Sequence, residues 1–328
     1  MVSLGLNYCF IQLAFLFSFR RHSDTIAVSM KKSFLPYLVT VLLSSTSLIA
    51  GEKNDLPPRF RVDVDTVVVR VTVTDPLNRY VVGLEKEHFR VFENKLEQAL
   101  THFSNDKSPI SVGIIMDMSG SMGDNILSAR SSVIRFLEQG DPEDEYFLVT
   151  FNERSALVRD FTNRSDNIRN EISIKNPKGR TALYDAMYLG LEKIREGRHQ
   201  KKALIVITDG EDNSSRYTFS ELKDYVKETD VQIYVIGERG DMGYGRSIIS
   251  EIVRLTGARA FFPNNFKQLD YFCDLIHSEL RNQYLVGYTP TDRRADGSWR
   301  KLKVQLDPPE GMPKLKVRAK EGYFAPRN

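Results

Sequence analysis

Hydrophobic and polar residues alternate along residues 59–108. Within this segment, residues 67–74 read Val-Val-Val-Arg-Val-Thr-Val-Thr, with a valine at every second position. This period of two predicts a strand that buries one face. Turn residues follow at 75–78 and again at Asn94-Lys95. The other strands that we expect in this all-β piece are residues 80–82, 89–92 and 96–103.

The pattern changes from residue 110, where apolar runs alternate with amphipathic stretches up to residue 282. Runs that are apolar almost throughout are typical of strands buried on both faces. The strands expected here are residues 112–116, 146–151, 203–208 and 231–236. The helices expected here are residues 125–139, 181–194, 219–227, 247–255 and 266–280. Because strands alternate with helices, residues 110–282 are predicted to form an α/β domain with a doubly wound, mostly parallel sheet and helices on both faces.

Strand patterns return after residue 282. The strands expected here are residues 284–288, 299–306, 315–317 and 323–324. Neither β piece is large enough to be stable alone. We therefore expect residues 59–108 and 283–328 to pack into one β-sandwich, with the α/β domain inserted between them. The alternative is two separate small β units. Trp299 is expected in the sandwich core.

Residues 1–50 have the pattern of a targeting segment. Met30-Lys31-Lys32 precedes an apolar run, 34–43, and small residues lead to Ala50-Gly51. This order is typical of a signal peptide over residues 30–50, so we expect an exported protein of the periplasm or cell surface. A second apolar stretch, 4–19, precedes it, and we expect translation to start at Met30. The alternative is an uncleaved anchor, which would be the chain's only contact with a membrane.

Composition narrows the function classes. The chain has 328 residues and a net charge of only +3, and no basic run with interleaved aromatic residues occurs, so nucleic acid is not an expected partner. The hydrophobic share of 41% excludes a wholly disordered chain. The two cysteines, Cys9 and Cys273, and the scattered histidines have no zinc-binding spacing.

Oxygen-bearing side chains gather where predicted strands end. Asp117-Met118-Ser119-Gly120-Ser121 directly follows the strand at 112–116, and Asp209 follows the strand at 203–208. Thr181 opens the predicted helix at 181–194. In an open parallel sheet, ligands bind at the carboxyl ends of the strands, so these side chains are expected at one edge. Carboxylates and hydroxyls suit Mg²⁺, with Mn²⁺ or Ca²⁺ as alternatives, and disfavour zinc.

These positions resemble the metal-ion-dependent adhesion site of von Willebrand factor A-type domains. The family pattern is Asp-x-Ser-x-Ser, a later Thr and a later Asp-Gly. The matching residues are Asp117, Ser119, Ser121, Thr181 and Asp209. In that family the serines bind the metal directly, the threonine does so in the ligand-bound state, and the aspartates act directly or through water. The flanking residues 71–75, 89–94 and 322–326 are similar to a bacterial, acidobacterial-type group with such domains.

The resemblance implies an exported, metal-dependent protein-binding module, in which the ion takes an Asp or Glu side chain of a partner as its last ligand. Two alternatives stay open: a structural or assembly component of the cell envelope, and a metal-assisted hydrolase. We expect no enzyme, because the sequence shows no positioned general base for a hydrolase. Glu211 and Asp212 are interpreted as a solvated acidic loop, and the glycine-rich stretch 237–245 as a rim loop.

Overall fold

The computed structural model describes residues 66–174, 176–209, 211–237, 243–264 and 266–327. All of them belong to one compact unit, Phe60–Asn328. The expected targeting segment and the start at Met30 lie outside the described residues. None of the helices within the described ranges is long and apolar enough to cross a membrane.

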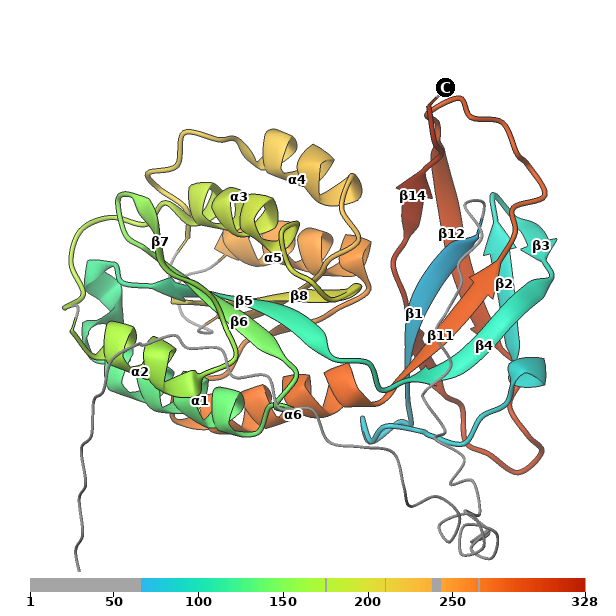
Figure 1. Ribbon diagram of the computed structural model, residues 1–328, viewed down its shortest axis with the longest axis horizontal. Coiled ribbons are helices and arrows are strands. Elements are labelled where there is room, and N and C mark those ends of the chain that lie inside the picture. Colours follow the sequence, from blue (N-terminus) through green and yellow to red (C-terminus); the bar gives the residue numbers. More distant parts are fainter. Residues whose placement is uncertain (1–65, 175, 210, 238–242, 265, 328) are drawn as a thin grey trace, which may run out of the picture. The chain divides into compact units, whose positions relative to one another are not determined.

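The α/β domain is built on a six-stranded sheet with the order β10-β9-β8-β5-β6-β7 (Figure 1). Its strands are β5 (Ile110–Asp117), β6 (Glu145–Phe151), β7 (Ser155–Thr162), β8 (Lys201–Thr208), β9 (Gln232–Gly237) and β10 (Ala260–Phe261). All neighbouring pairs are parallel except β6 and β7, which are antiparallel. The predicted α/β fold with a mostly parallel sheet is confirmed.

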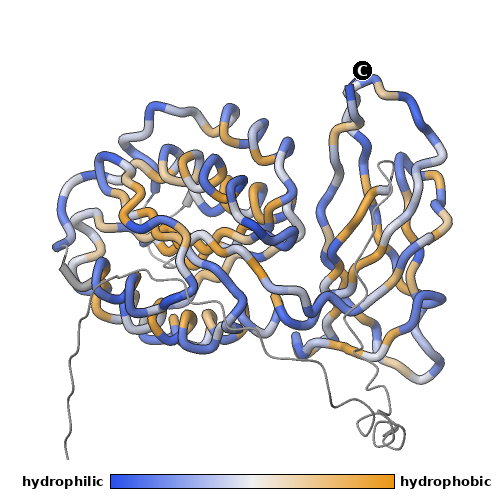
Figure 2. The backbone as a smooth tube through the Cα atoms, viewed as in Figure 1, coloured by the Kyte–Doolittle hydropathy of each residue, from blue (hydrophilic) through white to orange (hydrophobic). Residues whose placement is uncertain are grey.

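Helices cover both faces of this sheet (Figure 1). On one face lie α1 (Ile126–Glu138), α2 (Ser165–Ile174) and α6 (Leu269–Arg281). On the other lie α3 (Leu183–Ile194), α4 (Phe219–Lys227) and α5 (Gly243–Thr256). The central strand serves both layers, because Ile114 packs in the first core and Ile115 in the second. Figure 2 shows the resulting concentration of hydrophobic residues along the sheet.

The sequence pattern did not predict β7 and α2. The strand β7 lies at the sheet edge and is half-exposed, so its residues do not form an apolar run. The helix α2 contributes only Ile168 and Ile172 to the core, which is too few to produce a clear helical period. The strand expected at 80–82 is wrong, since only a single bridge between Thr74 and Tyr80 forms there.

The remaining strands form two four-stranded sheets, with the orders β13-β1-β11-β4 and β14-β12-β2-β3. The strands before the α/β domain are β1 (Val67–Thr74), β2 (Phe89–Glu93), β3 (Leu96–Gln98) and β4 (Leu100–Asp106). Those after it are β11 (Gln283–Tyr288), β12 (Trp299–Leu306), β13 (Lys316–Arg318) and β14 (Gly322–Phe324). Each sheet thus pairs strands from the two ends of the described chain, and one hydrophobic core joins both sheets. Asn94 and Lys95 turn the chain between β2 and β3 with φ values of 46° and 74°.

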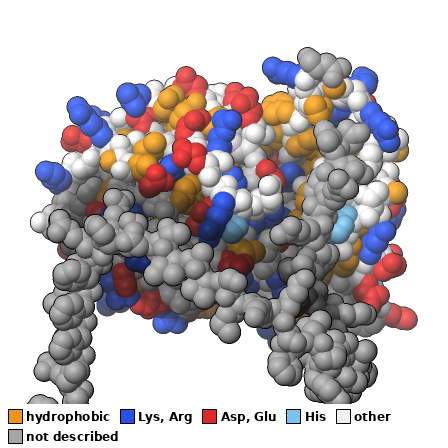
Figure 3. Space-filling model, in the orientation of Figure 1, with side chains coloured by type: hydrophobic (Ala, Val, Ile, Leu, Met, Phe, Trp, Pro, Cys, Tyr) orange, Lys and Arg blue, Asp and Glu red, His pale blue; other side chains and the backbone are white. Residues whose placement is uncertain are grey.

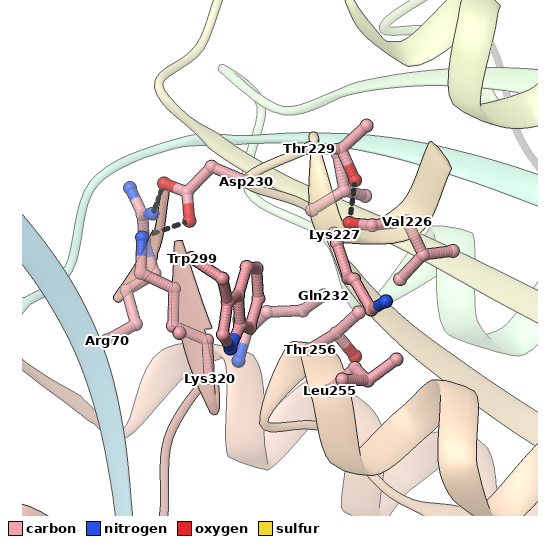
Figure 4. A pocket seen from close by; sticks show the side chains of 12 residues that line it. Arg70, Val226, Lys227, Thr229, Asp230, Gln232, Leu255, Thr256, Trp299 and Lys320 are labelled. Atoms are coloured by element: carbon pink, nitrogen blue, oxygen red, sulfur yellow. Dashed lines mark hydrogen bonds and ion pairs between the residues drawn. The ribbon is translucent and has the colours of Figure 1, made fainter. Parts of the chain in front are cut away.

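Trp299 does not lie in the sandwich core, so that expectation is wrong. On β12, Arg300 and Leu302 are buried, and alternation turns Trp299 to the opposite face. There its ring packs edge-on against Phe324, with 5.0 Å between ring centroids. It also lines a hollow of only about 20 Å³, which has room for little more than a water molecule (Figure 4).

Gly113 on β5 is required by the close approach of its neighbours. A Cβ atom at this position would overlap the ring of Phe147 and a methyl group of Leu204. We expect Gly113→Ala to lower the free energy of unfolding by about 1–3 kcal/mol, the usual cost of overpacking a core. Urea denaturation measures this loss. Gly123→Ala is the matched control, because no heavy atom lies within 4 Å of a Cβ there; equal losses in the two variants would contradict the argument.

Candidate metal centre

Asp117 is the last residue of β5 and its side chain is fully buried. Both of its carboxylate oxygens accept hydrogen bonds. The backbone N–H of Ser119 donates to Oδ1 at 2.7 Å, and the Thr208 hydroxyl donates to Oδ2 at 2.6 Å. Thr208 ends β8, the parallel neighbour of β5. Asp117 therefore joins the ends of two central strands and fixes the loop that follows it.

The two serines link this loop to Asp209. The hydroxyl oxygens of Ser119 and Ser121 lie 3.1 Å apart, and the Ser121 hydroxyl donates to Asp209 Oδ1 at 2.6 Å. The Asn125 amide donates to the other oxygen of Asp209 at 3.4 Å. The structure thus brings together four of the five predicted site residues, two carboxylates and two hydroxyls.

Thr181 reaches the same edge through backbone contacts. The N–H of Gly120 donates to the Gly179 carbonyl at 3.0 Å, which holds the loop before α3 against the serine loop. The N–H of Thr181 donates to the Asn213 side chain at 3.0 Å. No hydrogen bond among the described residues joins the Thr181 hydroxyl to the four other site residues. Thr181 is therefore placed beside the cluster without being part of its hydrogen-bond chain.

The acidic residues after Asp209 have structural partners. Glu211 accepts a hydrogen bond from the N–H of Gly245 at 3.0 Å, and Asp212 accepts one from the N–H of Tyr184 at 3.3 Å. These two acids do lie in a loop, but they are half-buried and hold the starts of α5 and α3, so they are only partly solvated. The expectation of a rim loop at 237–245 is corrected in part, because Gly243 already begins α5. Residues 238–242 lie outside the described residues.

The electrostatics of the site favour a bound cation. Burial raises the pKa of Asp117 to about 6, against the opposing effect of the hydrogen bonds from Thr208 and Ser119, and the nearby charge of Asp209 raises it further. Among the described residues, no Lys, Arg or His lies within ion-pair distance of Asp117 or Asp209. Two carboxylates thus meet at one edge without a positive side chain to balance them.

The chemistry of the donors fits a hard divalent cation. In the part of the chain that the structure describes, no group of three or more His, Cys, Asp or Glu side chains could hold a metal ion. A site here must therefore use hydroxyl oxygens beside its two carboxylates. Mg²⁺ accepts such oxygen ligands and retains several water molecules, whereas zinc and copper prefer nitrogen and sulfur.

Sequence reasoning missed Asn125 and Asn213, which orient Asp209 and Thr181. Asn125 contacts Asp209, which lies 84 positions later in the chain, and Asn213 contacts Thr181, which lies 32 positions earlier. No local sequence signal marks such contacts, because asparagine is common near turns, where its side chain hydrogen-bonds to the neighbouring backbone.

An α/β domain with this cluster at the carboxyl edge of its sheet matches a known family. Residues 112–211 match the family model of the von Willebrand factor type A domain. Over these residues, the resemblance of the sequence motifs to von Willebrand factor A-type domains is confirmed. No curated protein is significantly similar to the chain in sequence.

Several solved structures resemble the chain. The conserved hypothetical protein BatB from Bacteroides thetaiotaomicron is 17% identical, with 53% of this chain and 100% of that chain covered and a TM-score of 0.44. The vWF domain of the type V pili tip protein Mfa5 from Porphyromonas gingivalis is 14% identical, with 52% and 95% covered and a TM-score of 0.43. A von Willebrand factor type A protein from Catenulispora acidiphila is 13% identical, with 75% and 65% covered and a TM-score of 0.48.

Proposed function

We propose that this chain is an exported protein-binding module that works through a bound Mg²⁺ ion, with Mn²⁺ or Ca²⁺ as alternatives. The residues that would hold the ion are Asp117, Ser119, Ser121, Thr181 and Asp209. The observation that carries the proposal is the hydrogen-bonded chain from Ser119 through Ser121 to Asp209. The same loop is bonded to Asp117 through the Ser119 N–H, and no cationic side chain among the described residues pairs with either acid. When bound, the ion supplies the positive charge that attracts an Asp or Glu side chain of a partner protein.

The side chains of the site differ in exposure, and this difference favours one direction of approach. Asp117 and Ser119 are buried, whereas Asp209 is half-buried and Ser121 is exposed. The buried side chains of Asp117 and Ser119 keep fixed orientations, and water does not reach the site from their side. A partner carboxylate would approach from the side of Ser121 and Asp209.

A catalytic role has less support than binding. A metal-assisted hydrolase needs a general base near the reacting group. Three of the histidines have partners outside the metal centre. His88 accepts a hydrogen bond from the N–H of Glu85, His199 contacts the Glu143 carbonyl, and the ring of His277 packs against Phe136. A screen with phosphate-ester and carboxylic-ester substrates tests this alternative, and we expect no metal-dependent turnover.

A protein partner fits the charge distribution better than nucleic acid does. Lys and Arg side chains are interspersed with Asp and Glu on the visible face in Figure 3, so that face carries no extended field of one sign. Export to the periplasm or cell surface is part of the proposal and rests on the sequence of residues 30–50. If the chain were instead a structural or assembly component of the envelope, metal would stabilise the fold without controlling partner binding.

The proposal is tested with a fluorescent ten-residue peptide that carries one Asp among Gly and Ser residues. We expect the Mg²⁺-loaded chain to bind this peptide, and we expect binding to disappear with a chelator or with Asn in place of Asp. Fluorescence polarisation measures both effects. Binding that is unchanged by the chelator would overturn the proposal.

Thr181→Ala separates binding of the ion from binding of the partner. Because its hydroxyl lies outside the hydrogen-bond chain of the cluster, we expect this variant to change Mg²⁺ affinity by less than about threefold, while Ser121→Ala lowers it by about tenfold or more. Peptide affinity should fall in both variants. Equal loss of Mg²⁺ affinity in the two variants, measured by competition with a fluorescent magnesium indicator, would contradict the distinction.

A further inference from the structure

An open hollow adjoins the metal centre at the same edge of the sheet. It has a volume of about 630 Å³, far more than a water molecule needs. Its lining includes Met118, Asn152, Arg154, Asn176 and Lys178. It is large enough to receive side chains of a partner, and none of these residues belongs to the proposed set of metal ligands.

Met118 belongs both to the lining of the hollow and to the loop of the metal centre. This residue stands between Asp117 and Ser119 in the sequence and is buried. Its N–H donates to the Phe151 carbonyl at 2.6 Å, and its carbonyl accepts from the N–H of Lys178 at 2.9 Å. The wall of the hollow is therefore fixed to the loop that carries the serines.

The hollow presents positive charge that the protein itself does not balance. Arg154 and Lys178 are both exposed, and neither forms an ion pair or a side-chain hydrogen bond with another described residue. The nearby acid Glu153 lies against Gly179 and is not within ion-pair distance of either cation. Asn152 and Asn176 add amide groups to the same lining.

We propose that this hollow, the basic groove lined by Arg154 and Lys178, binds a second carboxylate of the same partner segment. The inference rests on the proposed function, because the first carboxylate is the one taken by the metal. The partner would then be an acidic peptide segment, and a protein with an isolated Asp or Glu would bind more weakly.

The geometry limits the spacing of the two acids. Phe151 ends β6 in register with Asp117, and neighbouring strands lie about 5 Å apart. Arg154 follows three residues later, in the turn between β6 and β7. An extended peptide advances about 3.3–3.6 Å per residue, so acids two to four residues apart would reach both sites.

The test uses two fluorescent ten-residue peptides with saturating Mg²⁺. One carries a single Asp, and the other carries the same Asp and a Glu three residues later. We expect the second peptide to bind about tenfold more tightly, as two surface charge pairs allow. The double variant Arg154→Glu, Lys178→Glu should lose this advantage while it keeps Mg²⁺ binding and single-Asp binding.

The matched control is the double variant Lys301→Glu, Lys303→Glu, which makes the same change of charge on the exposed face of β12. It should keep the advantage of the two-acid peptide. If both charge-reversal variants lose the advantage equally, or if the unmodified chain shows none, the groove proposal is overturned while the metal site stands. If Mg²⁺ does not bind at all, the proposed function itself fails.

Discussion

Replacing Glu279 with alanine is expected to lower the free energy of unfolding by about 3–5 kcal/mol, because it breaks a buried ion-pair network. Glu279 lies on α6 and is fully buried. Arg318 on β13 donates to its Oε2 at 2.7 Å, and Arg259 Nε lies 3.2 Å from the same oxygen. The Tyr234 hydroxyl on β9 donates to Oε1 at 3.2 Å. Without the carboxylate, two largely buried guanidinium groups lose their counter-charge.

Urea denaturation at neutral pH measures this loss. The matched control is Glu251→Ala, since the Glu251–Lys223 pair is about one-third exposed and should contribute less than about 1 kcal/mol. A loss for Glu279→Ala that is no larger than that of the control would show that the network does not join α6 to the neighbouring strands energetically.

Mg²⁺ is expected to stabilise the fold, and Asp209→Ala is expected to remove this effect. A ligand at one hundred times its Kd adds about 2.7 kcal/mol to the free energy of unfolding when only the folded state binds it. At an unfolding entropy of about 2.1 cal/mol/K per residue, this corresponds to a rise in Tm of about 4–5 °C for a chain of this size. Asp209→Ala removes the acceptor of the Ser121 hydroxyl and one of the two carboxylates of the site.

Thermal unfolding in the presence of Mg²⁺ and in the presence of a chelator gives the Tm of the Mg²⁺-bound and the Mg²⁺-free chain. Asp224→Ala is the control, because Asp224 is an exposed acid on α4 that pairs with Lys227 away from the site. It should keep the full Mg²⁺ effect. A Tm that does not respond to Mg²⁺ in the parent chain, or a response that survives in Asp209→Ala, would contradict the assignment of Asp209.

The regular elements of the α/β domain could be predicted because their patterns are strong. The apolar strands β5 and β8 stand out, since both faces of each are covered by helices. The edge strand β7 and the helix α2 could not be predicted, because half-exposed elements have mixed composition. Trp299 was misplaced because its size suggested a core position, whereas alternation along β12 decides its face.

The site was predictable in its principal residues because parallel strands end at one edge. The residues that follow β5 and β8 had to meet there. In the structure Asp117 accepts a hydrogen bond from Thr208 at the end of β8, and Ser121 donates one to Asp209. The basic groove could not be predicted, because Arg154 and Lys178 are far apart in sequence. Backbone contacts of Met118 with Phe151 and with Lys178 bring the two segments together. Isolated basic residues in loops give no pattern in the sequence.

Calorimetric titration of Mg²⁺ and Mn²⁺ into the chain, beside the double variant Asp117→Ala, Ser119→Ala, shows whether a metal ion binds at the end of β5. We expect one saturable site in the parent chain that is absent from the variant. No binding in the parent, or binding that the variant retains, would contradict a metal centre at the end of β5.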